Sequence, residues 1–196
     1  DPILLLALPV IAIVLLIVRG LPSALAAPAG STRREVLAVA FLGATGLPII
    51  VEVVDVSQVG RVAEIADCIR VGTRNAQNFE LLKSVGAQQE FPVLFKRGMG
   101  ITLEESLNAV EYVASGGNHK IIFGLRGMKT NLGDPHRNFV DFAMVPVVKR
   151  LTRMPVCIDP SHSVGKKLIA PDGLLDIHHV TAQGLIAGAN MVLVDF

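Results

Sequence analysis

Residues 92–127, PVLFKRGMGITLEESLNAVEYVASGGNHKIIFGLRG, decide the fold class. The stretch begins and ends with short apolar runs, and the segment between them has the spacing of apolar residues typical of a helix. Thr102 stands before two glutamates and predicts the N-cap of that helix, while SGGN at 115–118 predicts its end. The stretch therefore predicts a strand, a helix and a second strand parallel to the first.

The same alternation extends over residues 46–196. Further apolar runs occur in PIIVEVV, DCIRVG, PVCIDPSH and NMVLVDF, and segments with helical spacing separate them. Strands that are apolar along nearly their whole length are buried on both faces, which favours a parallel sheet. Strict alternation of strand and helix leaves two architectures open, a doubly wound sheet and a closed barrel.

Charged and chemically capable side chains cluster at the carboxyl ends of six successive predicted strands. They are Glu52 and Asp55, Arg74, Lys96 with Arg97, Arg126, Asp159 with His162, and Asp195. In a parallel barrel the carboxyl ends of all strands meet at one face, and that face carries the active site. If the strands close into such a barrel, as in a TIM barrel, we expect these residues to converge.

The chemistry of these residues divides into two groups. Arg74, Lys96 and Arg126, together with Arg97, form a cationic cluster suited to phosphate and carboxylate groups. A separate pair, His162 and Asp195, offers an imidazole and a carboxylate to a divalent metal ion. The pattern predicts a small phosphorylated acid as substrate and a reaction at a metal-polarised carbonyl group.

Composition argues against several other classes of protein. The 196 residues include 18 basic and 17 acidic side chains, so the overall charge does not favour a nucleic-acid surface. Cys68 and Cys157 lie in apolar runs, which predicts reduced core thiols in a cytoplasmic protein. The apolar run 3–18 contains Pro9 and is shorter than the roughly 20 residues of a membrane helix, which favours two buried strands.

Five segments carry a resemblance to a known family. They are, in order, VGTRNAQNFELLKSVG, PVLFKRGM, FGLRG, HRNFVDFAMVPVVKRLTRMPVCIDPSHSVGKK and GANMVLVDF. They resemble the 3-deoxy-D-arabino-heptulosonate 7-phosphate (DAHP) synthases of the short microbial type, which are related to 3-deoxy-manno-octulosonate 8-phosphate synthase. The RNAQNFELL segment favours the heptulosonate branch. The resemblance covers residues 46–196 and implies a (β/α)8 barrel.

The resemblance implies a metal-dependent transferase that condenses phosphoenolpyruvate with erythrose 4-phosphate in an aldol-like reaction. This is the first step of the shikimate pathway and so of aromatic amino acid biosynthesis. The implied cofactor is a divalent metal ion, with manganese, iron, cobalt and zinc left open. The resemblance also implies a cytoplasmic homodimer or homotetramer without nucleic-acid or membrane partners.

Roles for individual cations follow from the resemblance. Arg74, Lys96 and Arg126 are implied to hold the phosphate and carboxylate of phosphoenolpyruvate, with Arg97 as a further substrate-binding residue. Lys96 is also a candidate proton donor, and with Arg126 and His162 it makes up the expected catalytic set.

The implied metal ligands are His162 and Asp195, and Asp195 stands where the family has a glutamate. Asp for Glu keeps the charge but shortens the reach by one methylene. Asp159 is expected to orient the loop and the imidazole rather than bind metal. For Ser161 a turn-forming hydroxyl is favoured over a nucleophile.

Residues 1–45 depart from the family pattern. The family's first strand ends in a GPCS motif whose Cys is a metal ligand, and its second strand leads into a KPRTS motif that binds erythrose 4-phosphate. This sequence contains neither motif. The first twenty residues are also too few for strand, helix and strand, because a parallel crossover needs about ten to twelve residues. We expect one barrel domain, 1–196, with an irregular or incomplete part at 1–45 and strands three to eight in 46–196.

From the resemblance we also expect the last barrel helix and a further Asp ligand of the family to be absent after the eighth strand. Two explanations stay open: the sequence joins separate segments of a complete enzyme, or it is a diverged protein that has lost half of its site. The first is favoured, because an uncovered barrel strand invites edge pairing. The functional alternatives are a non-catalytic barrel that binds phosphoenolpyruvate, and an octulosonate 8-phosphate synthase.

Overall fold

Residues 47–131 and 136–194 are described by the computed structural model of the chain. Their strands form one six-stranded sheet, in which every neighbouring pair is parallel and the strand order follows the chain. The strands are β1 (Ile50–Val53), β2 (Cys68–Val71), β3 (Val93–Lys96), β4 (Ile121–Leu125), β5 (Val156–Ile158) and β6 (Met191–Val192). This order without a reversal excludes a doubly wound arrangement of these six strands, because that fold changes direction at a switch point.

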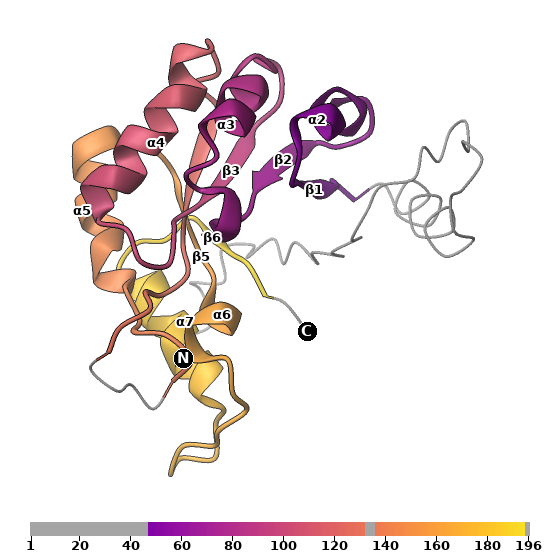
Figure 1. Ribbon diagram of the computed structural model, residues 1–196. Coiled ribbons are helices and arrows are strands. Elements are labelled where there is room, and N and C mark those ends of the chain that lie inside the picture. The colour runs from indigo at the N-terminus through magenta and orange to yellow at the C-terminus, as the bar shows by residue number, and fades with distance from the viewer. Residues whose placement is uncertain (1–46, 132–135, 195–196) are drawn as a thin grey trace, which may run out of the picture.

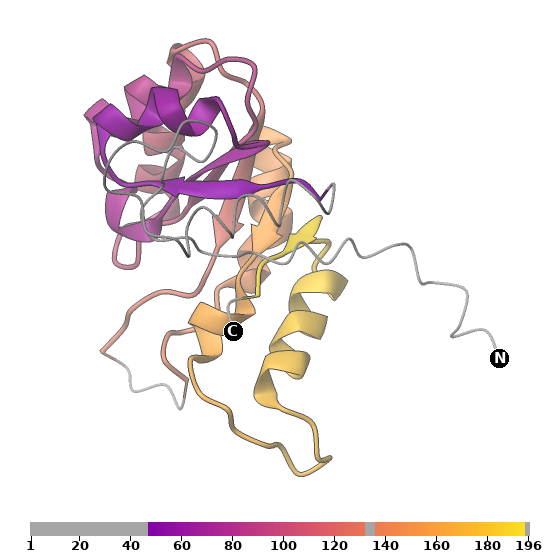
Figure 2. The ribbon, with the colours of Figure 1, turned by 90° about the vertical axis from the view of Figure 1, so that its right-hand side faces the viewer.

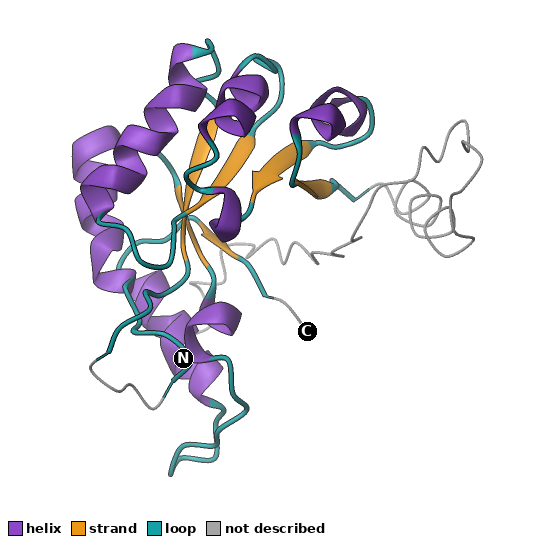
Figure 3. Cartoon of the chain, viewed as in Figure 1, coloured by secondary structure: helices purple, strands orange, loops and turns teal. Residues whose placement is uncertain are grey.

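Helices connect the strands and cover one side of the sheet. The sheet curls into a half-barrel, and the helices from α2 to α5 lie on its outer side (Figures 1, 2 and 3). The helices are α2 (Val56–Ala63), α3 (Phe79–Gly86), α4 (Leu103–Ser115), α5 (Val145–Thr152), α6 (Pro160–Val164) and α7 (Asp176–Ile186), with 3-10 turns η2 (Thr73–Asn75) and η3 (Phe142–Met144).

Local sequence explains where α4 begins and ends. The Oγ1 of Thr102 accepts a hydrogen bond from the N–H of Glu105 at 3.1 Å, and the Glu105 carboxylate accepts one from the N–H of Thr102 at 2.7 Å. This reciprocal pair is a capping box. Gly116 forms the C-cap directly after the last helical residue. Both ends of the helix expected from the sequence are therefore confirmed.

Alternation of side chains along each strand separates two apolar layers. Outward-facing residues such as Val71, Phe95 and Phe123 pack with the helices in the main core. Inward-facing Cys68, Leu94, Cys157 and Leu193 form a second, smaller cluster on the concave side. Side chains two positions further along a strand face the same way. Arg70, Lys96 and Asp159 each follow a member of the inner cluster by two positions, which places their polar groups at the carboxyl ends of the strands.

The inner cluster confirms the expectation for the two cysteines. Both thiols are buried and neither forms a disulfide. Burial raises the pKa of Cys68 to about 11 and that of Cys157 to about 12. Both sulfurs therefore stay protonated at neutral pH and serve as core packing.

The parallel α/β architecture and the six strands expected after residue 46 are confirmed, and a curled half-barrel is consistent with an incomplete (β/α)8 barrel. The two strands expected in residues 3–18 and the metal ligand expected at Asp195 lie outside the described residues. In the part of the chain that is described, no helix is long and apolar enough to cross a membrane.

Candidate active site

Asp159 lies at the centre of the candidate site, between the end of β5 and the first turn of α6. Its Oδ1 accepts a hydrogen bond from the N–H of His162 at 3.0 Å, and its Oδ2 accepts one from the imidazole Nδ1 at 2.9 Å. The same Oδ2 pairs with the ammonium group of Lys96 at the end of β3. Only 2% of Asp159 is exposed, so this carboxylate joins a lysine and a histidine inside the protein.

Burial alone would raise the pKa of Asp159, but the His162 hydrogen bond and the charge of Lys96 outweigh it and lower the pKa to about 2. The carboxylate is ionised at neutral pH, so Nδ1 of His162 carries the proton that Oδ2 accepts. Nε2 is then the ring nitrogen that would coordinate a metal ion. A carboxylate that fixes an imidazole in this way is the usual outer partner of a metal-bound histidine. The expectation that Asp159 orients the loop and the imidazole agrees with this geometry.

Arg126 supplies a buried positive charge beside this carboxylate. It follows β4 directly and is 2% exposed, and its Nε has no hydrogen-bond partner among the described residues. Desolvation lowers the pKa of Arg126, the carboxylate of Asp159 opposes that shift, and the positive charge of Arg137 adds to it. A buried charge without a hydrogen-bonded partner is costly, so this position favours a bound anion.

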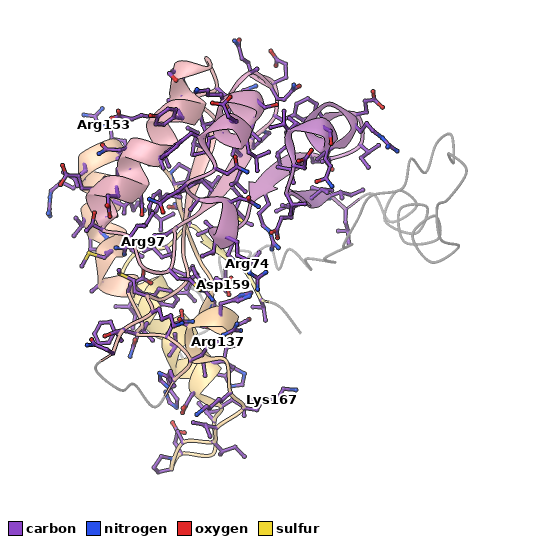
Figure 4. All side chains as sticks on the ribbon, in the orientation of Figure 1. Arg74, Arg97, Arg137, Arg153, Asp159 and Lys167 are labelled. Carbon is purple, nitrogen blue, oxygen red and sulfur yellow. The ribbon has the colours of Figure 1, made fainter. Side chains whose placement is uncertain are left out.

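Two further arginines lie near Arg126. Arg74 belongs to η2 after β2, and Arg137 belongs to the connection between β4 and α5. The positive charges of both lower the pKa of Arg126, and both side chains are exposed. Figure 4 shows Arg74 and Asp159 near the carboxyl ends of the strands and Arg137 beside α6, whereas Arg153 lies far from them. Within the described residues, the side chains of Arg74 and Arg137 make no hydrogen bond or ion pair.

Arg97 has a different environment from the other cations. Its Nη1 donates to Oδ2 of Asp141 at 3.1 Å, and its Nη2 donates to the carbonyl oxygen of Ile101 at 3.3 Å. The other oxygen of Asp141 accepts a hydrogen bond from the N–H of Gly127 at 2.8 Å. The sequence groups Arg97 with the substrate cations, which stays a prediction. The structure places Arg97 in a buried ion pair that ties the end of β3 to the loop after β4.

Two acidic residues of the expected cluster also differ from one another. Asp55 is the N-cap of α2 and accepts a hydrogen bond from the N–H of Ser57 at 2.9 Å, so it does not belong to the group of converging residues. Glu52 does face the concave side, where it pairs with Arg70. The Nε and Nη1 of Arg70 are buried and have no hydrogen-bond partner among the described residues. This pair lies at the carboxyl ends of β1 and β2.

The sequence did not single out Arg137 or Asp141. Both lie in a long connection with little regular structure, for which periodicity gives no position in space. The described residues contain no group of three side chains that could hold a metal ion. The described metal candidate is His162, whose fixed tautomer fits one position of a divalent ion.

Comparison with known proteins connects this geometry to a family. The family model described as "DAHP synthetase I family" matches residues 22–194. A phospho-2-dehydro-3-deoxyheptonate aldolase of Thermotoga maritima is 37% identical over 151 residues, which are 76% of this chain and 42% of that protein. A 2-dehydro-3-deoxyphosphooctonate aldolase of Syntrophotalea carbinolica is 35% identical over 121 residues, covering 61% of this chain and 42% of the relative.

Solved structures similar to this chain come from the same group of enzymes. A truncated form of 3-deoxy-D-arabino-heptulosonate 7-phosphate synthase from Thermotoga maritima aligns with a TM-score of 0.69 and 36% identity, over 78% of this chain and 54% of that one. A second aldolase structure from the same organism aligns with a TM-score of 0.71 and 34% identity, over 80% of this chain and 45% of that one. The chain thus spans less than half the length of the curated relatives named above.

Proposed function

Because the chain belongs to the DAHP synthetase I family, we propose that this protein is a metal-dependent DAHP synthase. It joins phosphoenolpyruvate to erythrose 4-phosphate and releases inorganic phosphate. The three carbons of the first substrate and the four of the second give the seven-carbon sugar acid after which the structural relatives are named.

The observation that carries the proposal is the environment of Arg126. Its guanidinium is buried, its Nε has no hydrogen-bond partner in the described part of the chain, and two further arginines act on its charge. Guanidinium groups bind phosphate and carboxylate groups through charge-assisted hydrogen bonds. A substrate with two anionic groups, such as phosphoenolpyruvate, would supply the missing partners.

Different side chains of this site bind the two anionic groups of phosphoenolpyruvate. Arg74 and Arg126 hold the phosphate group, and Lys96 holds the carboxylate and is the candidate proton donor. Asp159 fixes the ammonium group of Lys96, so the lysine is placed before the substrate arrives. Arg97 supports these residues through its ion pair with Asp141.

In the proposed reaction the third carbon of phosphoenolpyruvate attacks the aldehyde carbon of erythrose 4-phosphate. The aldehyde oxygen takes up a proton, for which Lys96 is the candidate donor. Water then adds at the second carbon, and phosphate leaves as the keto group forms. The arginines neutralise charge on the departing phosphate. A divalent ion of manganese, iron, cobalt or zinc, held by His162 and Asp195, would polarise the aldehyde when bound.

A second candidate activity is octulosonate 8-phosphate synthesis, because several curated relatives carry the name 2-dehydro-3-deoxyphosphooctonate aldolase. Eight carbons require a five-carbon aldose phosphate in place of the four-carbon one. A non-catalytic barrel that only binds phosphoenolpyruvate is the third candidate. A cytoplasmic location and a homodimer or homotetramer complete the proposal and rest on the resemblance alone.

The test is an assay of the purified protein with phosphoenolpyruvate, either aldose phosphate and each of the four metal ions. Loss of phosphoenolpyruvate and formation of the sugar acid are measured together. We expect turnover with erythrose 4-phosphate and a divalent ion, and none after treatment with a chelator. Binding of phosphoenolpyruvate without turnover under all conditions would leave the non-catalytic barrel, and turnover with only the five-carbon aldose phosphate would leave the octulosonate activity.

A further inference from the structure

The main chain around Arg137 is fastened to the loop that carries His162. The N–H of Arg137 donates to the carbonyl oxygen of Val164 at 2.8 Å, and the N–H of Asn138 donates to that of Ser163 at 3.0 Å. The side-chain Nδ2 of Asn138 donates to the carbonyl oxygen of His162 at 2.6 Å. Three hydrogen bonds therefore fix the position of Arg137 relative to the metal-binding candidate.

The side chain of Arg137 runs along Gly165, the C-cap of α6. A Cβ atom at Gly165 would lie 2.4 Å from the Cβ and 2.6 Å from the Cδ of Arg137, closer than atoms can pack. Gly165 also has a φ of +65°, which favours glycine. Only a glycine at this position leaves room for the aliphatic part of the arginine side chain. Arg137 is thus built against the site loop, although its guanidinium is exposed.

The cations of the site fall into two sets by their partners. Lys96 is paired with Asp159, and Arg97 is paired with Asp141. The second set is Arg74, Arg126 and Arg137, for which the described residues supply no ion pair. The positive charges of Arg74 and Arg137 disfavour the charged form of the buried Arg126, and the carboxylates of Asp159 and Asp141 favour it without forming an ion pair with it.

We propose that Arg137 is a substrate-binding residue, which holds the phosphate group of phosphoenolpyruvate together with Arg74 and Arg126. The proposal rests on the proposed function and adds a residue to its site. A phosphate monoester carries about −1.5 to −2 charges at neutral pH, and the carboxylate adds one more. Lys96 is available for the carboxylate, so the three guanidinium groups without carboxylate partners are available for the phosphate, and Arg137 adds hydrogen-bond donors to those of Arg74 and Arg126.

The test compares three variants by calorimetric titration of the full chain with phosphoenolpyruvate, and separately with inorganic phosphate. No aldose phosphate is present. We expect Arg137→Ala to weaken binding of both anions by about tenfold to a hundredfold, as for loss of a hydrogen bond between charged groups. Arg137→Lys keeps the charge and should recover part of the loss. Lys167→Ala removes an exposed cation from the connection between α6 and α7 and should bind as the unchanged protein does.

A further variant moves the arginine without removing its charge. Gly165→Ala introduces the Cβ that collides with the Arg137 side chain, and it should also weaken both anions. A melting curve for each variant checks that it folds. Unchanged affinity of a folded Arg137→Ala protein for both anions would overturn the proposal. In a separate assay of turnover, an effect of Arg137→Ala confined to the KM of the aldose phosphate would also overturn the proposal, because Arg137 would then bind the other substrate.

These titrations do not depend on turnover. If the protein forms no sugar acid but Arg137→Ala still weakens both anions, the enzymatic proposal fails and the role of Arg137 in phosphate binding stands.

Discussion

The imidazole Nδ1 of His162 lies 2.9 Å from Oδ2 of Asp159, three residues earlier in the chain. The same oxygen also pairs with Lys96 on a different strand. One carboxylate therefore orients the candidate metal ligand and the candidate proton donor at once. A change at Asp159 should disturb both halves of the site, and the next prediction uses this coupling.

Asp159→Asn should weaken metal binding and stability together. The amide cannot compensate the buried ammonium of Lys96, and loss of one member of a buried ion pair costs about 3 kcal/mol of unfolding free energy. Loss of an outer-shell carboxylate weakens metal affinity by about tenfold to a hundredfold. Cobalt titration and urea unfolding measure the two effects.

A matched control for this variant exists on the surface. Asp172 and His179 form another aspartate–histidine pair at 2.9 Å, but both side chains are more than 40% exposed. Asp172→Asn should therefore leave metal affinity and stability nearly unchanged. Equal cobalt affinity in Asp159→Asn and the unchanged protein would remove Asp159 from the metal site.

Arg126→Met should separate stability from ligand binding. The methionine keeps much of the side-chain volume and removes a buried charge that lacks a hydrogen-bond partner at Nε, so the ligand-free protein should melt at the same temperature or higher. A ligand that binds the folded protein but not the unfolded chain raises the melting temperature, so phosphoenolpyruvate should do so in the unchanged protein. That rise should disappear in the variant, as a thermal melting series over ligand concentration would show. A normal rise would mean that Arg126 does not contact the ligand.

Arg97→Met should lower stability and leave phosphoenolpyruvate binding largely intact, the opposite of Arg126→Met. Loss of Arg97 leaves Asp141 buried and without its ion-pair partner, which costs about 3 kcal/mol of unfolding free energy. Phosphoenolpyruvate affinity should fall much less than in Arg126→Met. Both quantities come from unfolding and titration of the same preparation. A stable variant that no longer binds phosphoenolpyruvate would restore Arg97 to the substrate cations.

Cys68 and Cys157 should resist alkylation in the folded protein. A thiol with a pKa of about 11 is ionised in about one molecule in a thousand at pH 8, and burial blocks access to it as well. Iodoacetamide should therefore label neither cysteine at pH 8 until urea unfolds the chain, and mass spectrometry counts the labels. Rapid labelling of a native thiol would contradict the assignment to the inner apolar cluster.

Much of the fold could be predicted because its signals are local. The capping box at Thr102 and the glycine stop after Ser115 act within one turn of α4, so four or five residues define each end. Apolar strands with polar residues at their ends also predicted that Lys96 and Asp159 would meet, since parallel strands bring such ends together. Strand alternation explains why Arg97 differs from Lys96, because neighbouring residues face opposite ways.

The remaining errors concern contacts that no local signal encodes. Asp55 was grouped with the site because it follows a strand. Its carboxylate instead accepts a hydrogen bond from the N–H of Ser57 and caps α2. Arg137 and Asp141 reach the site through the irregular connection after β4. Their placement depends on hydrogen bonds from Arg137 to Val164, from the neighbouring Asn138 to Ser163, and from Gly127 to Asp141, which join distant parts of the chain or the two ends of the connection.

The two apolar layers of the sheet limit how this site can evolve. Lys96 and Asp159 face the concave side because each follows an inward-facing residue by two positions. Insertion or deletion of one residue within such a strand would turn its charged end toward the helices and its core residues toward the substrate. Natural variation in this family should therefore place length changes in the loops after the strands. New substrate preferences would arise by substitution at the strand ends, where the pairing register is not disturbed.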